Sequence, residues 1–241
     1  MKNICIFVIF INLCSLSFCE ERTQLLNALW NRNKKEVINV LEKGENPDQK
    51  NEYGVPAIIL ALVFNDTAVI KTFIKFNANV NIQDNNGFTP LIVASIQKQY
   101  AICELLLKNG ADADKKHNGG FTALMLAAQN NDLKMVSLLL ENGASVDIDR
   151  PQGGTALGFA ADKGNLAIVK ILLANKSNIN FTDAVGGYTP LMIAVYMKRY
   201  ETIDYLLKMG AEKDIETKDG STVYDFARQI NDKKINKLLG L

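Results

Sequence analysis

One short phrase returns along this chain with a spacing of 33 or 34 residues. It starts at six glycines, and an alanine follows seven residues after each of them: Gly54, Gly87, Gly120, Gly153, Gly187 and Gly220. A fixed period of this length is typical of arrays in which each repeat is one small structural unit stacked on its neighbours. The period therefore predicts a solenoid, in which neighbouring repeats bury one another, rather than one compact core.

The register of the phrase defines seven repeats. One period before Gly54, the stretch "ERTQLLNA" keeps the alanine at Ala28 but has no glycine. We place the repeats within residues 20–241, at 21–53, 54–86, 87–119, 120–152, 153–186, 187–219 and a shortened 220–241. The ends of such an array need polar outer surfaces. The lysines of the first and last repeats, such as Lys34 and Lys233, meet that need.

Each repeat is predicted to begin with a short helix. In "GFTPL", Thr89 offers a side-chain cap, and Pro90 comes next, where the N–H it lacks would have no partner anyway. The apolar positions that follow are Leu91 and Ala94, and the small alanine allows a neighbouring helix to approach closely.

A second helix and a tight loop complete each repeat. Val136, Leu139 and Leu140 show the three-and-four spacing of a buried stripe. The helix is predicted to end in the left-handed conformation, at Asn77 or Lys176 in two repeats and at glycine in four others: Gly44, Gly110, Gly143 and Gly210. The stretch that follows, such as "NIQDNNG", has the Asn, Asp and Gly content of a hairpin.

From about residue 21 to residue 241 the chain resembles the ankyrin-repeat family. The resemblance rests on the period, on the starts "GFTPL" and "GYTPL", and on the ends "LLLKNGADA" and "LLLENGASV". It implies an all-α solenoid of helix-turn-helix units joined by β-hairpin-like loops. The histidine usual after the TPL leucine is absent, so the Thr–His hydrogen-bond network of the family cannot form. The residues in its place are Ile59, Ile92, Met125, Gly158, Met192 and Asp225.

The resemblance also implies a concave face that binds another protein through the hairpin tips and first helices. Apolar and aromatic side chains on that face are the candidates for partner binding, because such residues anchor protein interfaces. They are Tyr53, Phe64, Phe88, Ile96, Phe121, Tyr188, Tyr196 and Met197. In the competing interpretation several of these rings pack on the adjacent hairpin. That interpretation fits Tyr196 and Met197 least well.

The sequence offers no support for catalysis. His117 is the only histidine, and it stands in a predicted hairpin tip with no nucleophile near it in the pattern. Cys103 takes the buried-stripe position of Val136 and Val169, as a small core residue would. The 27 basic residues face 26 acidic ones, which leaves no surplus for binding phosphates. We therefore expect no enzyme activity, no cofactor or metal site, and no nucleic-acid partner.

Residues 1–19 are predicted to be a signal peptide. Lys2 is their only charge, and an apolar run too short to span a bilayer comfortably follows it. Cleavage after Cys19 would leave Glu20 as the new N-terminus. Alternatively, "LSFC" resembles a loose bacterial lipobox, in which Cys19 becomes the lipidated first residue, although Phe18 is bulkier than that motif usually allows. An uncleaved membrane anchor is a third interpretation.

Two functions follow from these features. The signal segment and the repeats favour an exported protein-binding module in the periplasm or at the cell surface of a bacterium. The alternative is a structural or protective envelope protein, tethered as a lipoprotein through Cys19 and without catalysis. Contact with a membrane is expected only through that anchor. Within the array, repeat 153–186 is predicted to open first, because Gly158 lies inside a helix and Lys176 stands at a left-handed cap.

Overall fold

The computed structural model describes residues 23–63 and 65–241, and within these residues it contains fourteen α-helices and no β-strand. One isolated antiparallel bridge joins Lys50 and Pro56. The all-α fold predicted from the sequence is confirmed. The predicted signal peptide, Cys19 and Phe64 lie outside the described residues.

Two compact units meet in the sequence between Asp112 and Ala113. The helices of the N-terminal unit are α2 (Gln24–Trp30), α3 (Lys34–Glu42), α4 (Ala57–Val63), α5 (Thr67–Lys75), α6 (Pro90–Ile96) and α7 (Tyr100–Lys108). Those of the C-terminal unit are α8 (Ala123–Gln129), α9 (Leu133–Glu141), α10 (Ala156–Lys163), α11 (Leu166–Ala174), α12 (Pro190–Tyr196), α13 (Tyr200–Lys208), α14 (Val223–Ile230) and α15 (Lys233–Leu239).

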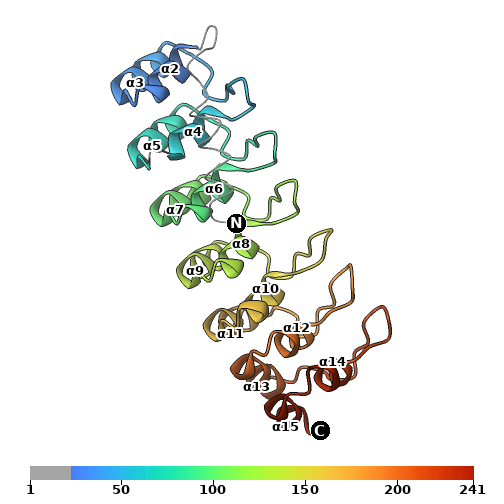
Figure 1. Cartoon of the computed structure of the whole chain (residues 1–241). Helices are drawn as coiled ribbons and strands as arrows, with labels where there is room; N and C mark the ends of the chain where they lie inside the picture. The colour runs from blue at the N-terminus through green and yellow to red at the C-terminus, as the bar shows by residue number, and fades with distance from the viewer. Residues whose placement is uncertain (1–22, 64) are drawn as a thin grey trace. The chain divides into compact units, whose positions relative to one another are not determined.

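Within each unit the helices form successive antiparallel pairs, one pair in each repeat (Figure 1). The first helices of neighbouring pairs contact one another, as α8, α10 and α12 do, and the second helices do the same. The long loops project from the side of the first helices (Figure 1). Each pair therefore buries the face of the next, which is the packing that the sequence period requires.

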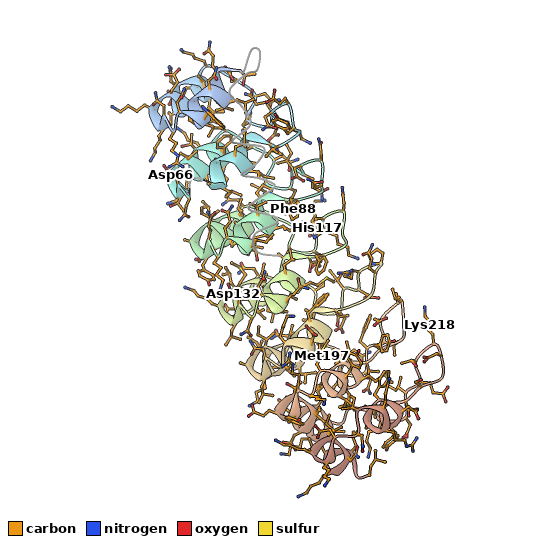
Figure 2. The ribbon with its side chains drawn as sticks, in the orientation of Figure 1. Asp66, Phe88, His117, Asp132, Met197 and Lys218 are labelled. Atoms are coloured by element: carbon orange, nitrogen blue, oxygen red, sulfur yellow. The ribbon has the colours of Figure 1, made fainter. Side chains whose placement is uncertain are left out.

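The helix ends follow the local chemistry of the sequence. The Thr89 hydroxyl oxygen accepts a hydrogen bond from the backbone N–H of Ile92 at 3.2 Å, as an N-cap should. The side chains of Asp66 and Asp132 cap the second helices α5 and α9 in the same way (Figure 2). At the other end, the residues predicted to be left-handed all have φ between 58° and 89°: Gly44, Asn77, Gly110, Gly143, Lys176 and Gly210.

Apolar side chains fill the place of the histidine that the family usually carries. Ile59, Ile92, Met125 and Met192 are each at most 2% exposed. In the last repeat Asp225 takes this place and closes a capping box, since its Oδ2 accepts from the backbone N–H of Thr222 at 2.9 Å. Cys103 is fully buried, as its position in the apolar stripe predicts.

A ladder of Asp and Asn side chains joins each repeat to the next. Asp147 accepts from the Ser177 hydroxyl at 2.6 Å and from the backbone N–H of Asn178 at 2.9 Å. Four other side chains at the same place in their repeats each accept a backbone N–H 31 or 32 residues later: Asp48, Asn81, Asp114 and Asn180. This ladder fixes the spacing of neighbouring repeats near the start of each loop.

No helix in the described ranges combines the length and the apolar character needed to cross a bilayer.

Candidate functional site

Several loops are shaped by a hydrogen-bond acceptor at a constant place in the repeat. Asp84 Oδ1 accepts from the backbone N–H groups of Asn86 at 2.9 Å and Phe88 at 2.8 Å. In the next loop His117 stands at this place, and its Nδ1 accepts from the Gly119 N–H at 2.8 Å. The only histidine of the chain is therefore a turn residue.

One of the candidate binding residues, Phe121, packs in a stack of aromatic rings. The Phe121 ring lies 5.5 Å from that of His117 and 5.4 Å from that of Phe159, with interplanar angles of 12° and 25°. The Arg150 guanidinium lies 4.2 Å from the centre of the Phe121 ring. Phe121 is half-buried by these neighbours. It holds the bases of adjacent loops together, as the competing interpretation expects.

Three other candidates in the C-terminal unit remain exposed, and we call them the exposed trio: Tyr188, Tyr196 and Met197. Their side chains are 41%, 59% and 39% exposed. Tyr196 is the last residue of α12, and Met197 is the C-cap that follows it (Figure 2). The Tyr188 ring lies 5.9 Å from that of Phe226, whereas polar residues would be less costly at the positions of Tyr196 and Met197.

The candidates of the N-terminal unit are less prominent. Tyr53, Phe88 and Ile96 are all half-buried. The loop that contains Tyr53 is held from the next loop, because the Asn85 side-chain amide donates to the Tyr53 carbonyl at 2.9 Å. Phe64 lies outside the described residues. The most exposed of the described candidates are thus in the C-terminal unit.

A pocket of about 400 Å³ opens next to Tyr188. It lies between two successive loops and the first helices α8, α10 and α12, and it is lined by Gln129, Gln152, Gly153, Gly154, Gly158, Phe159, Asp162, Asp183, Val185, Gly186, Tyr188 and Ile193. Tyr188 belongs both to the trio and to this lining. Gln129, Asp162 and Tyr196 each stand nine residues after the glycine of their repeat. Tyr196 therefore continues the row of side chains that borders the pocket.

The titratable groups with shifted pKa values in the described residues lie outside this pocket. They are Glu104, Tyr200, Asp219, Asp225 and Asp232. The described residues also contain no group of three or more His, Cys, Asp or Glu side chains that could hold a metal ion. What the pocket offers is shape, aromatic walls and two carboxylates, which are features of a binding site.

The pocket was not predicted from the sequence, where Gly158 was considered only as a residue that destabilises its helix. A usable signal was present: the glycines at 154 and 158 stand where other repeats carry large side chains, such as Tyr188 and Met192.

Comparison with known proteins agrees with the architecture. A family model described as ankyrin repeats (3 copies) matches residues 25–117 and 124–219, which is more than half of the chain. The crystal structure of the ankyrin repeat domain of Bcl-3, a member of the IkappaB protein family, is similar with a TM-score of 0.83 and 22% sequence identity, and the match covers 92% of this chain and 100% of that one. No curated protein matches the sequence. Ankyrin repeats generally mediate protein–protein interaction. On its repeats and their packing, the chain belongs to the ankyrin-repeat family.

Proposed function

We propose that the chain is an exported interaction module that binds another protein through the loops and first helices of its C-terminal unit. The observation that carries this proposal is the exposed trio, of which Tyr188 also lines the pocket. Large apolar side chains next to a concave site are typical of the residues that dominate binding energy in protein interfaces. Membership of the ankyrin-repeat family supports protein binding as the class of function, and the exposed trio is the proposed contact surface.

Export is the second part of the proposal, and it rests on the sequence of residues 1–19. A single lysine followed by an apolar run supports secretion to a periplasm or cell surface, with a bacterial host as the expected source. The protein would then act on a partner outside the cytoplasm. Neither nucleic acid nor a cofactor is part of this proposal.

Partner capture tests the binding surface. The mature chain and a Tyr196→Ala/Met197→Ala variant would be used as baits in envelope extracts of the host. We expect the double variant to lose at least tenfold in affinity for the captured partner, since interface anchors of this kind contribute about 2 kcal/mol or more. Because both side chains are exposed, its unfolding free energy should stay within about 0.5 kcal/mol of the wild type.

Met209→Ala is the matched control. Met209 is 52% exposed and lies at the C-cap of the second helix α13, so it belongs to a helix that does not line the pocket. The control should bind as the wild type does. Equal binding by the double variant and the wild type would contradict the proposed surface.

A lipid-tethered envelope protein is the second candidate function, favoured by "LSFC" at residues 16–19. Intact mass spectrometry of the protein from its own host separates the two candidates. A soluble protein that starts at Glu20 supports the diffusible module. A membrane-bound protein that starts at a lipid-modified Cys19, and is released by Cys19→Ala, supports the tether.

A further inference from the structure

Repeat 153–186 lacks two side chains that the other repeats of its unit possess. At the position after the phrase glycine, its neighbours carry Phe121 and Tyr188, whereas this repeat has Gly154. Four residues further on, they carry the buried Met125 and Met192, whereas this repeat has Gly158. Both glycines line the pocket, so its volume exists partly because these two side chains are missing.

The neighbours of the two glycines show how the space is bounded. A Cβ atom at Gly154 would lie 3.1 Å from Cζ of Phe159, so the Phe159 ring already covers that glycine. A Cβ at Gly158 would meet only Ile193 Cδ1 at 3.4 Å and Thr155 Oγ1 at 3.7 Å, which are ordinary contacts. A single methyl group therefore fits at Gly158, while a larger side chain there would extend into the space that a ligand would use.

The charged residues that line the pocket are both acidic. Among the twelve lining residues, Asp162 and Asp183 carry charge and no Lys or Arg is present. Oδ2 of Asp162 lies 2.7 Å from Nζ of Lys163, and these side chains are 23% and 43% exposed. Partly exposed pairs of this kind contribute about 0–1 kcal/mol, so an incoming cation can share or replace Lys163. Asp183 Oδ1 accepts backbone N–H groups of its own turn.

We propose that this pocket receives one aromatic side chain of the partner, flanked by an arginine or lysine that pairs with Asp162 or Asp183. The ring would lie against Phe159, Tyr188 and Ile193, and the cation would reach the carboxylates beside them. This inference rests on the proposed protein-binding function and adds the chemistry of the segment that is bound: an aromatic residue with basic neighbours.

Short peptides test this chemistry without knowledge of the partner. The probe is N-acetyl-Arg-Phe-Arg-amide, with N-acetyl-Glu-Phe-Glu-amide and N-acetyl-Arg-Ala-Arg-amide as matched controls. Each is titrated into the mature full chain while the backbone amide resonances of Gly154, Gly158 and Gly186 are followed by NMR. We expect saturable shifts at these glycines with the first peptide, at least fivefold weaker binding of the Glu peptide, and no saturable shifts with the Ala peptide.

Two variants locate the binding. Gly158→Leu should abolish the shifts at Gly154 and Gly186, because its side chain occupies the pocket. If Gly158→Leu fails to fold, Asp162→Asn serves instead, and it should reduce the preference for the Arg peptide over the Glu peptide at least threefold. Met209→Ala is the control and should still bind, since Met209 is exposed and does not line the pocket.

Each other outcome overturns part of the proposal. Equal binding of the Arg and Glu peptides would refute the cation, and equal binding of the Phe and Ala peptides would refute the aromatic anchor. Absence of any shift at the glycines would refute the pocket as a peptide site. The capture experiment with Tyr196 and Met197 variants does not depend on Gly158. Failure of the pocket and failure of the proposed function are therefore distinguishable.

Discussion

Gly158 lies in the interior of α10, where glycine is an unfavourable helix residue. A methyl group would meet no close neighbour there, since the nearest atoms to a Cβ at this position would lie 3.4 Å and 3.7 Å away. We expect Gly158→Ala to raise the free energy of unfolding by about 0.5–1 kcal/mol, because alanine loses less conformational entropy on folding. Urea unfolding followed by circular dichroism measures the change.

Gly153→Ala is the matched control, because the same substitution meets a different backbone there. Gly153 has φ of +78°, and a Cβ would lie 3.2 Å from the Asp183 carboxyl carbon. Alanine is strained in that conformation, so this variant should lose about 1 kcal/mol or more. A loss at Gly158→Ala as large as that at Gly153→Ala would refute the argument from helix propensity.

The side chain of Arg199 forms a hydrogen bond to the preceding repeat and does not cap its own helix. It stands at the N-cap of α13 but makes no side-chain cap; its Nε instead donates to the Asp162 carbonyl of the preceding repeat at 2.7 Å. Gln99 at the N-cap of α7 does the same toward Leu62 at 2.8 Å. We expect Arg199→Met, which keeps an apolar stem, to lower the free energy of unfolding by about 1 kcal/mol.

Arg228→Met is the comparison for that measurement. Arg228 belongs to an exposed pair with Asp225, and exposed pairs of this kind add little stability. Its loss should stay within about 0.5 kcal/mol in the same urea titration. Equal losses of unfolding free energy in Arg199→Met and Arg228→Met would show that the hydrogen bond between repeats adds no more stability than an exposed ion pair.

The link between neighbouring helix pairs depends on the ladder of Asp and Asn side chains. Asp147→Ala removes the acceptor of the Ser177 hydroxyl and of the Asn178 N–H, so it leaves those donors without this partner. We expect a loss of about 1–3 kcal/mol in the free energy of unfolding and faster amide exchange in residues 177–180. Hydrogen exchange resolved by residue measures the local effect.

Asp214→Ala tests whether the loss comes from the ladder or from removal of a carboxylate. Asp214 stands at the same place in repeat 187–219, is exposed, and accepts no bond from a following repeat within the described chain. Its removal should cost less than about 0.5 kcal/mol. An equal loss of unfolding free energy in Asp214→Ala and Asp147→Ala would show that the loss comes from removing a carboxylate and not from breaking the ladder.

The helices and their ends were predictable because they depend on neighbours in sequence. Thr89 caps a helix whose first residues follow it directly, and a glycine such as Gly110 or Gly143 suits the positive φ at which a second helix ends. The ladder was not predicted, although Asp or Asn recurs with the period at Asp48, Asn81, Asp114, Asp147 and Asn180. The pocket was not predictable in the same way, since Gly158 opens it only together with Asp183 and Ile193. The contacts of the Phe121 ring with Arg150 and Phe159 were not predictable for the same reason.

Along the array, the prediction that repeat 153–186 opens first can be tested by hydrogen exchange. Each repeat is stabilised by its own helices and by the faces of its two neighbours, so a locally weak repeat opens with less free energy than the others. Lys176 at φ of 66° adds strain to the same repeat that contains Gly158. Native-state exchange should show lower protection there than in residues 120–152, and Gly158→Ala should reduce the difference. Greatest protection in repeat 153–186 would contradict the prediction.

At the end of the array, two carboxyl groups have lowered pKa values, so we expect this part to be sensitive to acid. The Tyr200 hydroxyl donates to Asp232 at 2.8 Å and holds the pKa of that carboxyl below its usual 3.8. The Thr222 backbone N–H lowers the pKa of Asp225 in the same repeat. Folded chains thus bind fewer protons at these groups than unfolded chains, so their stabilisation is present above pH 3.8 and is lost as the pH falls through the folded values. We expect residues 220–241 to lose helical protection at a higher pH than residues 120–152.

The bond between Tyr200 and Asp232 sets a limit on the alkaline side as well. It raises the pKa of Tyr200 above 10.0, because the hydroxyl must keep its proton to donate. This contribution is fully present below pH 10.0 and is lost as the pH rises through the folded value. The urea midpoints of the wild type and Tyr200→Phe should therefore differ most between about pH 5 and pH 9 and converge toward both extremes. A difference near zero at every pH from about 2.5 to about 11 would mean that Tyr200 stabilises the last helix pair through its ring and not through its hydroxyl, because phenylalanine keeps the ring, whose centroid lies 4.4 Å from Nζ of Lys234.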